Sequence, residues 1–393
     1  MRSRFFFILM IICMLFLSAV PPQSRAATEP ADILNRQKAV LLVRENSSAL
    51  MDSIHNENIA RKNYEAQVNK SKTIDTEKVF LFRNPYTDED VYYYYRPEEQ
   101  MQMRLLKEFV PEQVKYAWEL RKISGKVTEN ALANTADNLF IGLYSAHQNV
   151  LLAEKSLELA KKAYLREKAR YDSGLITELD LESCFLDLRE AENALVKSER
   201  NYENIHRQFN MLAGLPVDYR FKLIGTPWTN KNRISISEDE AVTSALANRM
   251  EIWDLERQIR LIMQQMEIYR HKDVHRYHQN TKKDYEKATE RMEELKLKLS
   301  ETKYNIEKEI RQAYKDLEIS YLDMEISKER LLKQKKQLDT ITDQYNSGLV
   351  PASVMEQMEM SISQLEFAAN MSMITVLNKS DKFFRAISTG PGY

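Results

Sequence analysis

One turn occurs twice in the chain, and this duplication constrains the possible folds more than any other feature of the sequence. Tyr171-Asp-Ser-Gly174-Leu175-Ile returns as Tyr345-Asn-Ser-Gly348-Leu349-Val, at an offset of 174 residues. The same offset pairs Leu157 with Leu331, Ala194 with Ala368 and Phe209 with Phe383. A constant offset over more than fifty residues indicates an internal repeat, so we expect two copies of one structural unit.

Each copy has the pattern of a long helix, a tight turn and a second long helix. Apolar residues from Met292 to Tyr345 mostly follow steps of three, four and seven, with charged residues beside them, which is typical of a coiled coil. Only 8 glycines and 10 prolines occur in 393 residues, which favours few, long helices. We therefore predict an all-α fold of long antiparallel coiled-coil hairpins in two tandem repeats, with at most one short β-hairpin.

The residues around the turns have a mechanical interpretation. Gly174 and Gly348 can adopt the left-handed conformation that ends a helix. After the first turn, Thr177 is predicted to cap the next helix, with Asp180 three residues further on. After the second turn, Pro351 is expected at the first helical position, where its missing N–H costs nothing. The hairpins should bend sharply at both glycines.

The N-terminus has the features of an export signal. A basic start, an apolar run from Phe5 to Val20 and small residues up to Ala26 are typical of a signal peptide, with an uncleaved anchor as the alternative. Cys184 is then the only cysteine of the mature chain, which excludes an intramolecular disulfide. The predicted layout is a signal peptide at 1–26, a first repeat at 27–214, an irregular belt at 215–237, a second repeat at 238–388 and a tail at 389–393.

The two copies are expected to differ in length. Asn35-Arg36 and Asn248-Arg249 look equivalent and lie 213 residues apart, so the first copy should carry about 39 extra residues near 73–111. Val79-Phe-Leu-Phe82 and Val91-Tyr-Tyr-Tyr-Tyr95 lie in this insert, separated by Asn-Pro and acidic residues, and predict a short β-hairpin. Ser237 with Glu240 predicts a capping box where the second repeat begins.

Several short motifs resemble the TolC-like outer membrane efflux protein family. They are the repeated Tyr-x-x-Gly-Leu turn, the hairpin ending Leu212-Ala-Gly-Leu-Pro216 and the segment Ala247-Asn-Arg-Met-Glu-Ile252. The resemblance covers most of the mature chain and implies a homotrimer whose hairpins pack into a long hollow α-barrel. The chain departs from the family at the membrane end, because it lacks most of the family's β-barrel insert: only the first copy has strand-like runs, of four or five residues.

The resemblance also assigns roles to the turns. It places them at the tip of the α-barrel, where a periplasmic adaptor (membrane fusion protein) of an inner-membrane pump docks. The docking residues it implies are Tyr171, Gly174, Leu175, Tyr345, Gly348 and Leu349. Asp180 fits an acidic ring at the tip, whereas Val354 stands at the equivalent place in the second copy. The expected location is the cell envelope, in the outer membrane or periplasm, or at the extracytoplasmic face of a cell without an outer membrane, and membrane association is expected.

Other functions have weaker support in the sequence. The balance of 57 basic and 58 acidic residues indicates no nucleic-acid partner. No nucleophile elbow, phosphate loop or paired-carboxylate motif occurs, so we predict neither an enzyme nor a cofactor. His271, His275 and His278 would share one face of a helix and could bind a metal, but a solvated surface is the favoured interpretation and no metal site is predicted. A methionine-rich stretch after the second turn is interpreted as packing, not as a copper site.

The predicted function is therefore that of a passive efflux or secretion duct component, coupled to an inner-membrane pump through an adaptor. The second hypothesis is a structural or adaptor-like coiled-coil protein of the envelope that has lost the pore.

Overall fold

A computed structural model of the protein describes residues 33–225 and 235–390. The predicted signal peptide lies outside the described residues, as do part of the predicted belt and the last three residues of the tail.

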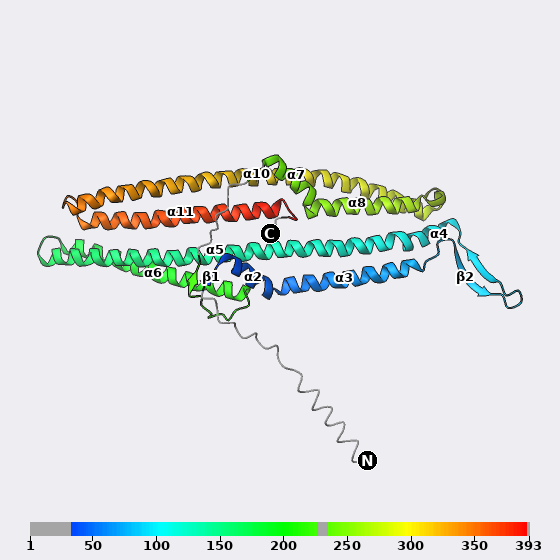
Figure 1. Ribbon diagram of the computed structural model, residues 1–393, viewed down its shortest axis with the longest axis horizontal. Coiled ribbons are helices and arrows are strands. Elements are labelled where there is room, and N and C mark those ends of the chain that lie inside the picture. Colours follow the sequence, from blue (N-terminus) through cyan, green and yellow to red (C-terminus); the bar gives the residue numbers. More distant parts are fainter. Residues whose placement is uncertain (1–32, 226–234, 391–393) are drawn as a thin grey trace, which may run out of the picture.

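The molecule is an elongated layer of antiparallel helices (Figure 1). Its two longest helices are α5 (Val110–Asp172) and α10 (Gln279–Asn346). On one side of the middle, α6 (Glu178–Leu212) packs along α5, and α11 (Ala352–Ala386) packs along α10. These pairs are the two predicted helical hairpins, and the all-α fold class is confirmed. None of the described helices is long and apolar enough to cross a membrane.

The other half of the layer repeats the arrangement with different helices. There α3 (Ser48–Lys72) packs along α5, and α8 (Met250–Tyr269) packs along α10. Each of them follows a helix of 11 residues near the middle of the molecule, α2 (Arg36–Asn46) before α3 and α7 (Glu238–Asn248) before α8. The helix break between the short and the long helix is thus a shared feature of both copies.

These breaks correct the predicted equivalence of the two copies. The helices α2 and α7 end at Asn46 and Asn248, 202 residues apart, and their N-caps Asn35 and Ser237 have the same separation. The predicted pairing of Asn35 with Asn248 is therefore wrong. Since the turns are 174 residues apart, the first copy carries 28 additional residues and not about 39. The shared Asn-Arg dipeptide is too short to establish the alignment of the two copies, which the bounds of the helices decide.

A β-hairpin projects from the end of the layer opposite the turns (Figure 1). It pairs β2 (Lys78–Arg83) with β3 (Asp90–Tyr94) antiparallel, with an irregular register between Phe80 and Phe82. The predicted short hairpin is confirmed. The chain returns to α5 through α4 (Pro97–Arg104) and the π-helical segment η1 (Leu105–Phe109). At the corresponding place the second copy has only the short helices η2 (His271–Asp273) and α9 (Val274–Tyr277).

A second, smaller ladder joins the start of the first copy to the belt. Here β1 (Ile33–Leu34) pairs in parallel with β4 (Leu223–Ile224). It was not predicted, because a ladder of two residues per strand has no recognisable alternation of apolar and polar residues.

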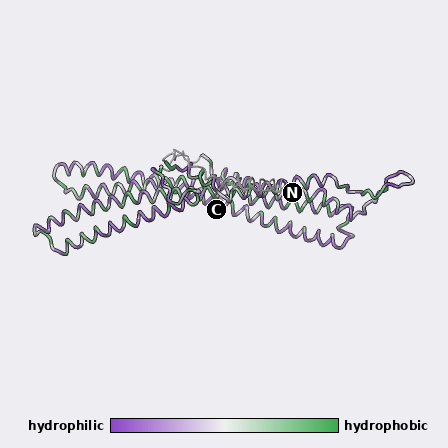
Figure 2. The backbone as a smooth tube through the Cα atoms, turned by 90° about the horizontal axis from the view of Figure 1, so that it is seen from below, coloured by the Kyte–Doolittle hydropathy of each residue, from purple (hydrophilic) through white to green (hydrophobic). Residues whose placement is uncertain are grey.

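The largest buried clusters lie in the middle of the layer, one in each copy. Phe209 in the first cluster and Phe383 in the second are 0% and 2% exposed, and they are one of the residue pairs related by the offset of 174. Away from the middle, apolar and polar residues alternate along each helix (Figure 2). Amphipathic helices of this kind bury one stripe against their neighbours and leave the rest of their surface polar.

Candidate functional site

The two turns lie at the same end of the molecule and have the same backbone conformation (Figure 1). Gly174 has φ +73° and Gly348 has φ +72°, so the predicted left-handed conformation of both glycines is confirmed. A Cβ added to either glycine would meet no atom within 4 Å. The requirement for glycine at these positions is therefore conformational and not steric.

Backbone hydrogen bonds close both turns in the same way. The amide N–H of Leu175 donates to the carbonyl of Arg170 at 2.9 Å, and that of Leu349 donates to the carbonyl of Gln344 at 2.8 Å. Such a bond over five residues, with a glycine in the left-handed region, defines the Schellman motif, which satisfies the last carbonyls of a helix. Each hairpin is therefore closed by its own backbone and has no need of a partner to hold the turn.

The turns present apolar side chains to the surroundings. Leu175 and Leu349 are 70% and 74% exposed, and Tyr171 and Tyr345 remain partly exposed beside them. Single exposed apolar residues are common on protein surfaces. Here the same two residue types occupy equivalent positions in both copies, so the end of the molecule carries a duplicated apolar surface.

Asp180 belongs to the helix cap that follows the first turn. Its Oδ2 accepts hydrogen bonds from the Thr177 amide at 3.0 Å and from the Thr177 hydroxyl at 2.7 Å, which confirms the predicted capping box. These hydrogen bonds, and to a smaller extent the charge of Arg170, lower the pKa of Asp180 below its ordinary value. The carboxylate is exposed, and its hydrogen bonds are to Thr177, the N-cap residue of its own helix.

The second turn is capped differently, and one prediction about it is wrong. Pro351 is the N-cap of α11 and not its first helical residue, because its ψ of 159° is extended. Pro351 offers no side chain that could accept a hydrogen bond from the start of α11, and Val354 replaces the carboxylate that stands at position 180. The two turns therefore share their backbone and their exposed leucine but differ in charge.

Polar contacts from two side chains of α5 help to hold the hairpins side by side between the turns and the middle of the layer. Arg166 of α5 forms an ion pair with Glu356 of α11 at 2.7 Å, and Lys155 donates to the Ser363 hydroxyl at 2.8 Å. Because Arg166 is 41% exposed on its side chain, this pair contributes little to stability in water. The contacts are local and lie between helices that already pack together.

A buried ionic cluster in the middle of the layer ties the two copies together. Asp137 of α5 is 1% exposed and accepts hydrogen bonds from Arg36 of α2 at 2.8 Å and from Arg385 of α11 at 3.0 Å. Arg36 also pairs with Asp381 of α11. The sequence does not indicate this cluster, because its members come from three helices and Asp137 is more than 100 residues from both Arg36 and Arg385.

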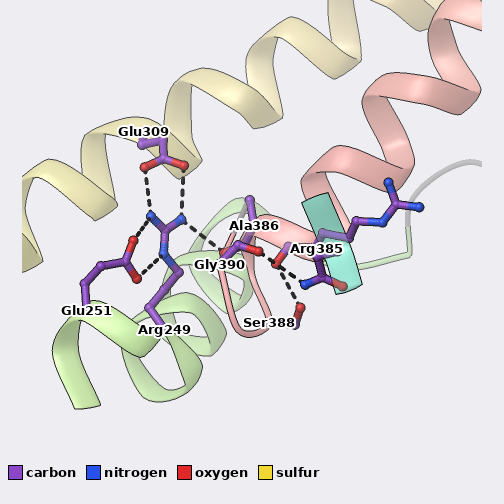
Figure 3. Close-up of polar contacts among 8 residues, drawn as sticks. Arg249, Glu251, Glu309, Arg385, Ala386, Ser388 and Gly390 are labelled. Carbon is purple, nitrogen blue, oxygen red and sulfur yellow. Dashed lines mark hydrogen bonds and ion pairs between the residues drawn. The ribbon is translucent and has the colours of Figure 1, made fainter. Parts of the chain in front are cut away.

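A buried arginine holds the break between α7 and α8 (Figure 3). The guanidinium of Arg249 is 3% exposed, pairs with Glu251 at 2.8 Å and Glu309 at 3.0 Å, and donates to the carbonyl of Ala386 at 3.3 Å. In the first copy Asn46 has the comparable role, because its side-chain amide donates to the carbonyl of Ala213 at 2.8 Å. Both copies thus fasten their helix break to the end of the second hairpin helix.

The three histidines considered for metal binding are not arranged along one helix. His271 contacts Arg104 and Gln100, His278 pairs with Glu98 at 2.9 Å, and His275 packs against the ring of Tyr285. The single helix that would have aligned them is broken, because Lys272 and Asp273 have positive φ angles. In the described part of the chain, no three His, Cys, Asp or Glu side chains form a group that could hold a metal ion.

Comparison with known proteins bears on the fold alone. No protein-family model matches the sequence, and no curated protein matches it. Among solved structures, the outer-membrane channel OprN aligns with a TM-score of 0.64 at 11% identity, covering 91% of each chain. The Campylobacter jejuni CmeC outer membrane channel aligns at 0.60 and 15% identity, over 91% of this chain and 86% of that one. The Vibrio cholerae outer membrane protein VceC aligns at 0.61 and 12% identity, over 91% and 96%.

The chain has the fold of these outer membrane channels. The predicted resemblance to the TolC-like family is thereby confirmed at the level of the fold. The alignments extend over about nine-tenths of both chains, so the likeness includes both hairpins and both helices beyond the middle.

Proposed function

We propose that this chain is the subunit of a passive exit duct in the cell envelope, which an inner-membrane pump uses through an adaptor protein. The observation that carries the proposal is the pair of turns with identical backbone and exposed leucine at one end of a fold shared with outer membrane channels. A passive conduit needs no catalytic residue and no cofactor, and its turns need only offer a surface to the adaptor.

The proposal requires several copies of the chain. One copy is an open layer of helices, and a layer encloses a channel only when neighbouring copies complete a ring (Figures 1 and 2). The resemblance to the TolC-like family implies three copies, so we propose a homotrimer. The turns of all copies would then lie together at one end of the ring, where the adaptor meets six of them.

The first experiment tests the duct itself. The mature chain is purified in detergent, its mass is measured by light scattering, and its conductance is recorded in planar lipid bilayers. We expect a trimer that forms discrete channels. A monomer at micromolar concentration overturns the proposal, and a stable oligomer without conductance favours the second hypothesis, a structural or adaptor-like coiled-coil protein that has lost the pore.

The second experiment tests docking at the turns. Leu175→Ser and Leu349→Ser, introduced together, remove the exposed apolar side chains and leave both glycines in place. We expect an unchanged fold, unchanged channels in bilayers and a loss of export in the native cell. Tyr277→Ser is the matched control, because Tyr277 is 84% exposed and belongs to α9, which contacts α4 and lies far from the turns. Export that survives the double substitution contradicts the docking role.

A further inference from the structure

The half of the layer that ends in the turns has two open edges. Its four helices follow one another in the order α10, α11, α5, α6, with contacts between each neighbouring pair (Figure 1). The two outer helices, α10 and α6, therefore each have a neighbour on one side only. The surfaces that they turn away from the layer are called here the α10 edge and the α6 edge.

The α10 edge combines exposed apolar residues with positive charge. Ile319, Leu322 and Ile326 are 53%, 51% and 46% exposed and follow one another at steps of three and four along the helix. Glu329, Lys333 and Lys336 continue the same line toward the turn at steps of three and four and are also exposed, so two basic residues outnumber one acidic residue along it. The segment 328–336 as a whole contains five basic residues and one acidic residue.

The α6 edge combines exposed apolar residues with negative charge. Leu179 and Leu186 are 74% and 58% exposed and lie seven residues apart, on the side of α6 that faces away from α5. Glu182 and Glu190 are exposed beside them. The segment 178–192 contains six acidic residues, with Arg189 as its one basic residue.

Glu190 and Lys333 lie at nearly the same height above the turns, whereas Glu182 and Lys336 differ by four residues, or about 6 Å. Glu190 is sixteen residues after Gly174, and Lys333 is fifteen residues before Gly348. Because a helix rises about 1.5 Å per residue, these two positions differ by about one residue in height. Leu186 and Lys336 are each twelve residues from the glycine of their own turn.

Four charged side chains of the two edges are free to form ion pairs with a neighbouring molecule. Within the described part of the chain, Lys333, Lys336, Glu182 and Glu190 have no ion-pair partner in their own subunit. By contrast, Lys335, which points toward the layer, pairs with Glu366 of α11 at 2.7 Å. The edges thus retain charge that a neighbouring molecule can neutralise.

We propose that the α10 edge of one subunit docks on the α6 edge of a second subunit, with Lys333 and Lys336 facing Glu182 and Glu190. The apolar residues form the seam of an intermolecular coiled coil, and the charges beside them select the partner. Pairing two α6 edges would bring acid to acid, and pairing two α10 edges would bring base to base, so symmetric pairing is disfavoured. Contacts between unlike edges close into a ring when the rotation allows it.

The inference rests on the proposed duct, for which it names the contact that closes the ring. It is tested by charge reversal in the full mature chain, with the oligomer measured by sedimentation at low and high salt. Lys333→Glu with Lys336→Glu, and separately Glu182→Lys with Glu190→Lys, should weaken association about tenfold or more at low salt. The variant carrying all four reversals should associate like the wild type.

Lys161→Glu with Lys168→Glu is the matched control, because it changes the charge equally on exposed positions of α5, an inner helix. Circular dichroism shows whether each variant folds. If both edge variants associate as well as the wild type, the edge assignment is overturned while the duct stands. If the wild type itself is monomeric, the duct and the edge contact fail together.

A cross-link tests the same contact through the proximity of the two edges instead of through their charge. Leu186→Cys and Lys336→Cys are combined in a Cys184→Ser background and oxidised with copper phenanthroline. Within one copy α5 and α11 separate these positions, so a disulfide between them joins two molecules. We expect covalent dimers and trimers on a denaturing gel. Their absence in a protein that is oligomeric in solution overturns the assignment, and Leu186→Cys with Lys161→Cys is the control that should give none.

Discussion

Asp137 of α5 accepts a hydrogen bond from Arg385 of α11 at 3.0 Å, so that one buried carboxylate joins the second repeat of the chain to the first. The same carboxylate receives two hydrogen bonds from Arg36, both at 2.8 Å. Asp137→Asn removes the carboxylate that pairs with Arg385 and one of the two that pair with Arg36, whose other partner is Asp381. We expect the free energy of unfolding to fall by about 3 kcal/mol, measured from urea midpoints by circular dichroism.

Glu65→Gln is the control for this substitution. Glu65 pairs with Arg61 on the surface of α3 at 3.8 Å, with both side chains about half exposed. Its loss should cost no more than about 0.5 kcal/mol. Equal effects of the two substitutions would mean that burial of Asp137 does not govern its contribution.

Alanine scanning of four glycines should separate conformational from steric requirements. Gly174→Ala and Gly348→Ala each place a side chain at positive φ in open space and should cost about 1 kcal/mol. Gly214→Ala should cost on the order of 2–3 kcal/mol, because its Cβ would lie 2.8 Å from Asn46 Cβ as well as at φ +66°. Thermal and urea denaturation of the three variants gives the order.

Gly142→Ala is the opposite case and serves as the control. Gly142 lies inside α5, and an added Cβ would meet Ile205 at 3.7 Å, which is ordinary van der Waals contact. Alanine there should stabilise the protein by about 0.5–1 kcal/mol, because glycine is the poorer helix former. A destabilising effect would contradict the helical geometry at this position.

The parts of the fold that the sequence predicted are those built from local, repeated signals. The turns at Gly174 and Gly348 and the cap at Thr177 each depend on a few neighbouring residues, and the structure has them as expected. Two other features join segments that are more than 100 residues apart: the ladder between β1 and β4, and the ion pairs of Asp137. No local sequence pattern predicts either of them. Charged residues such as Asp137 look in sequence like any solvated helix position.

The same distinction between local signals and long-range contacts applies to the candidate site. The turn residues were found because the duplication repeats them, while their contact with an adaptor remains a proposal. The open edges were not found, since neither the exposed faces of α6 and α10 nor their relative height can be read before the helices are placed. Lys333 and Glu190 carry no signal of their own among the 115 Lys, Arg, Asp and Glu residues of the chain.

His206 should make the protein sensitive to mild acid. It is fully buried among aromatic rings, and burial, together with the charge of Arg220, lowers its pKa to about 4. Between pH 6.5 and pH 4 the unfolded chain therefore binds a proton at this residue that the folded chain does not. Stability should fall as the pH decreases through this range, by about 2–3 kcal/mol at its lower end.

Unfolding midpoints between pH 7 and pH 4 measure this dependence, and His206→Phe is the comparison. Phenylalanine suits a site lined by Tyr202, Phe209 and Phe221 and cannot be protonated. The variant should lose stability less steeply over the range. If wild type and variant respond equally to pH, other groups dominate the acid response.

The capping box after the first turn allows the helix cap to be separated from the charge at the tip. Thr177→Ala removes the hydroxyl that accepts from the Asp180 amide and should cost about 1 kcal/mol at the start of α6, seen as faster amide hydrogen exchange there than in the wild type. Asp180→Asn keeps an oxygen that can accept from Thr177 but removes the charge, so exchange should change less.

Because the pKa of Asp180 is lowered in the fold, its stabilising effect is fully present at pH values above the ordinary pKa of aspartate and is lost as the pH falls through the lowered pKa. If Asp180 also contributes to an acidic ring, its asparagine variant alone should reduce the cation preference of the channels in bilayers. Equal cation preference in both variants would leave Asp180 as a capping residue and nothing more.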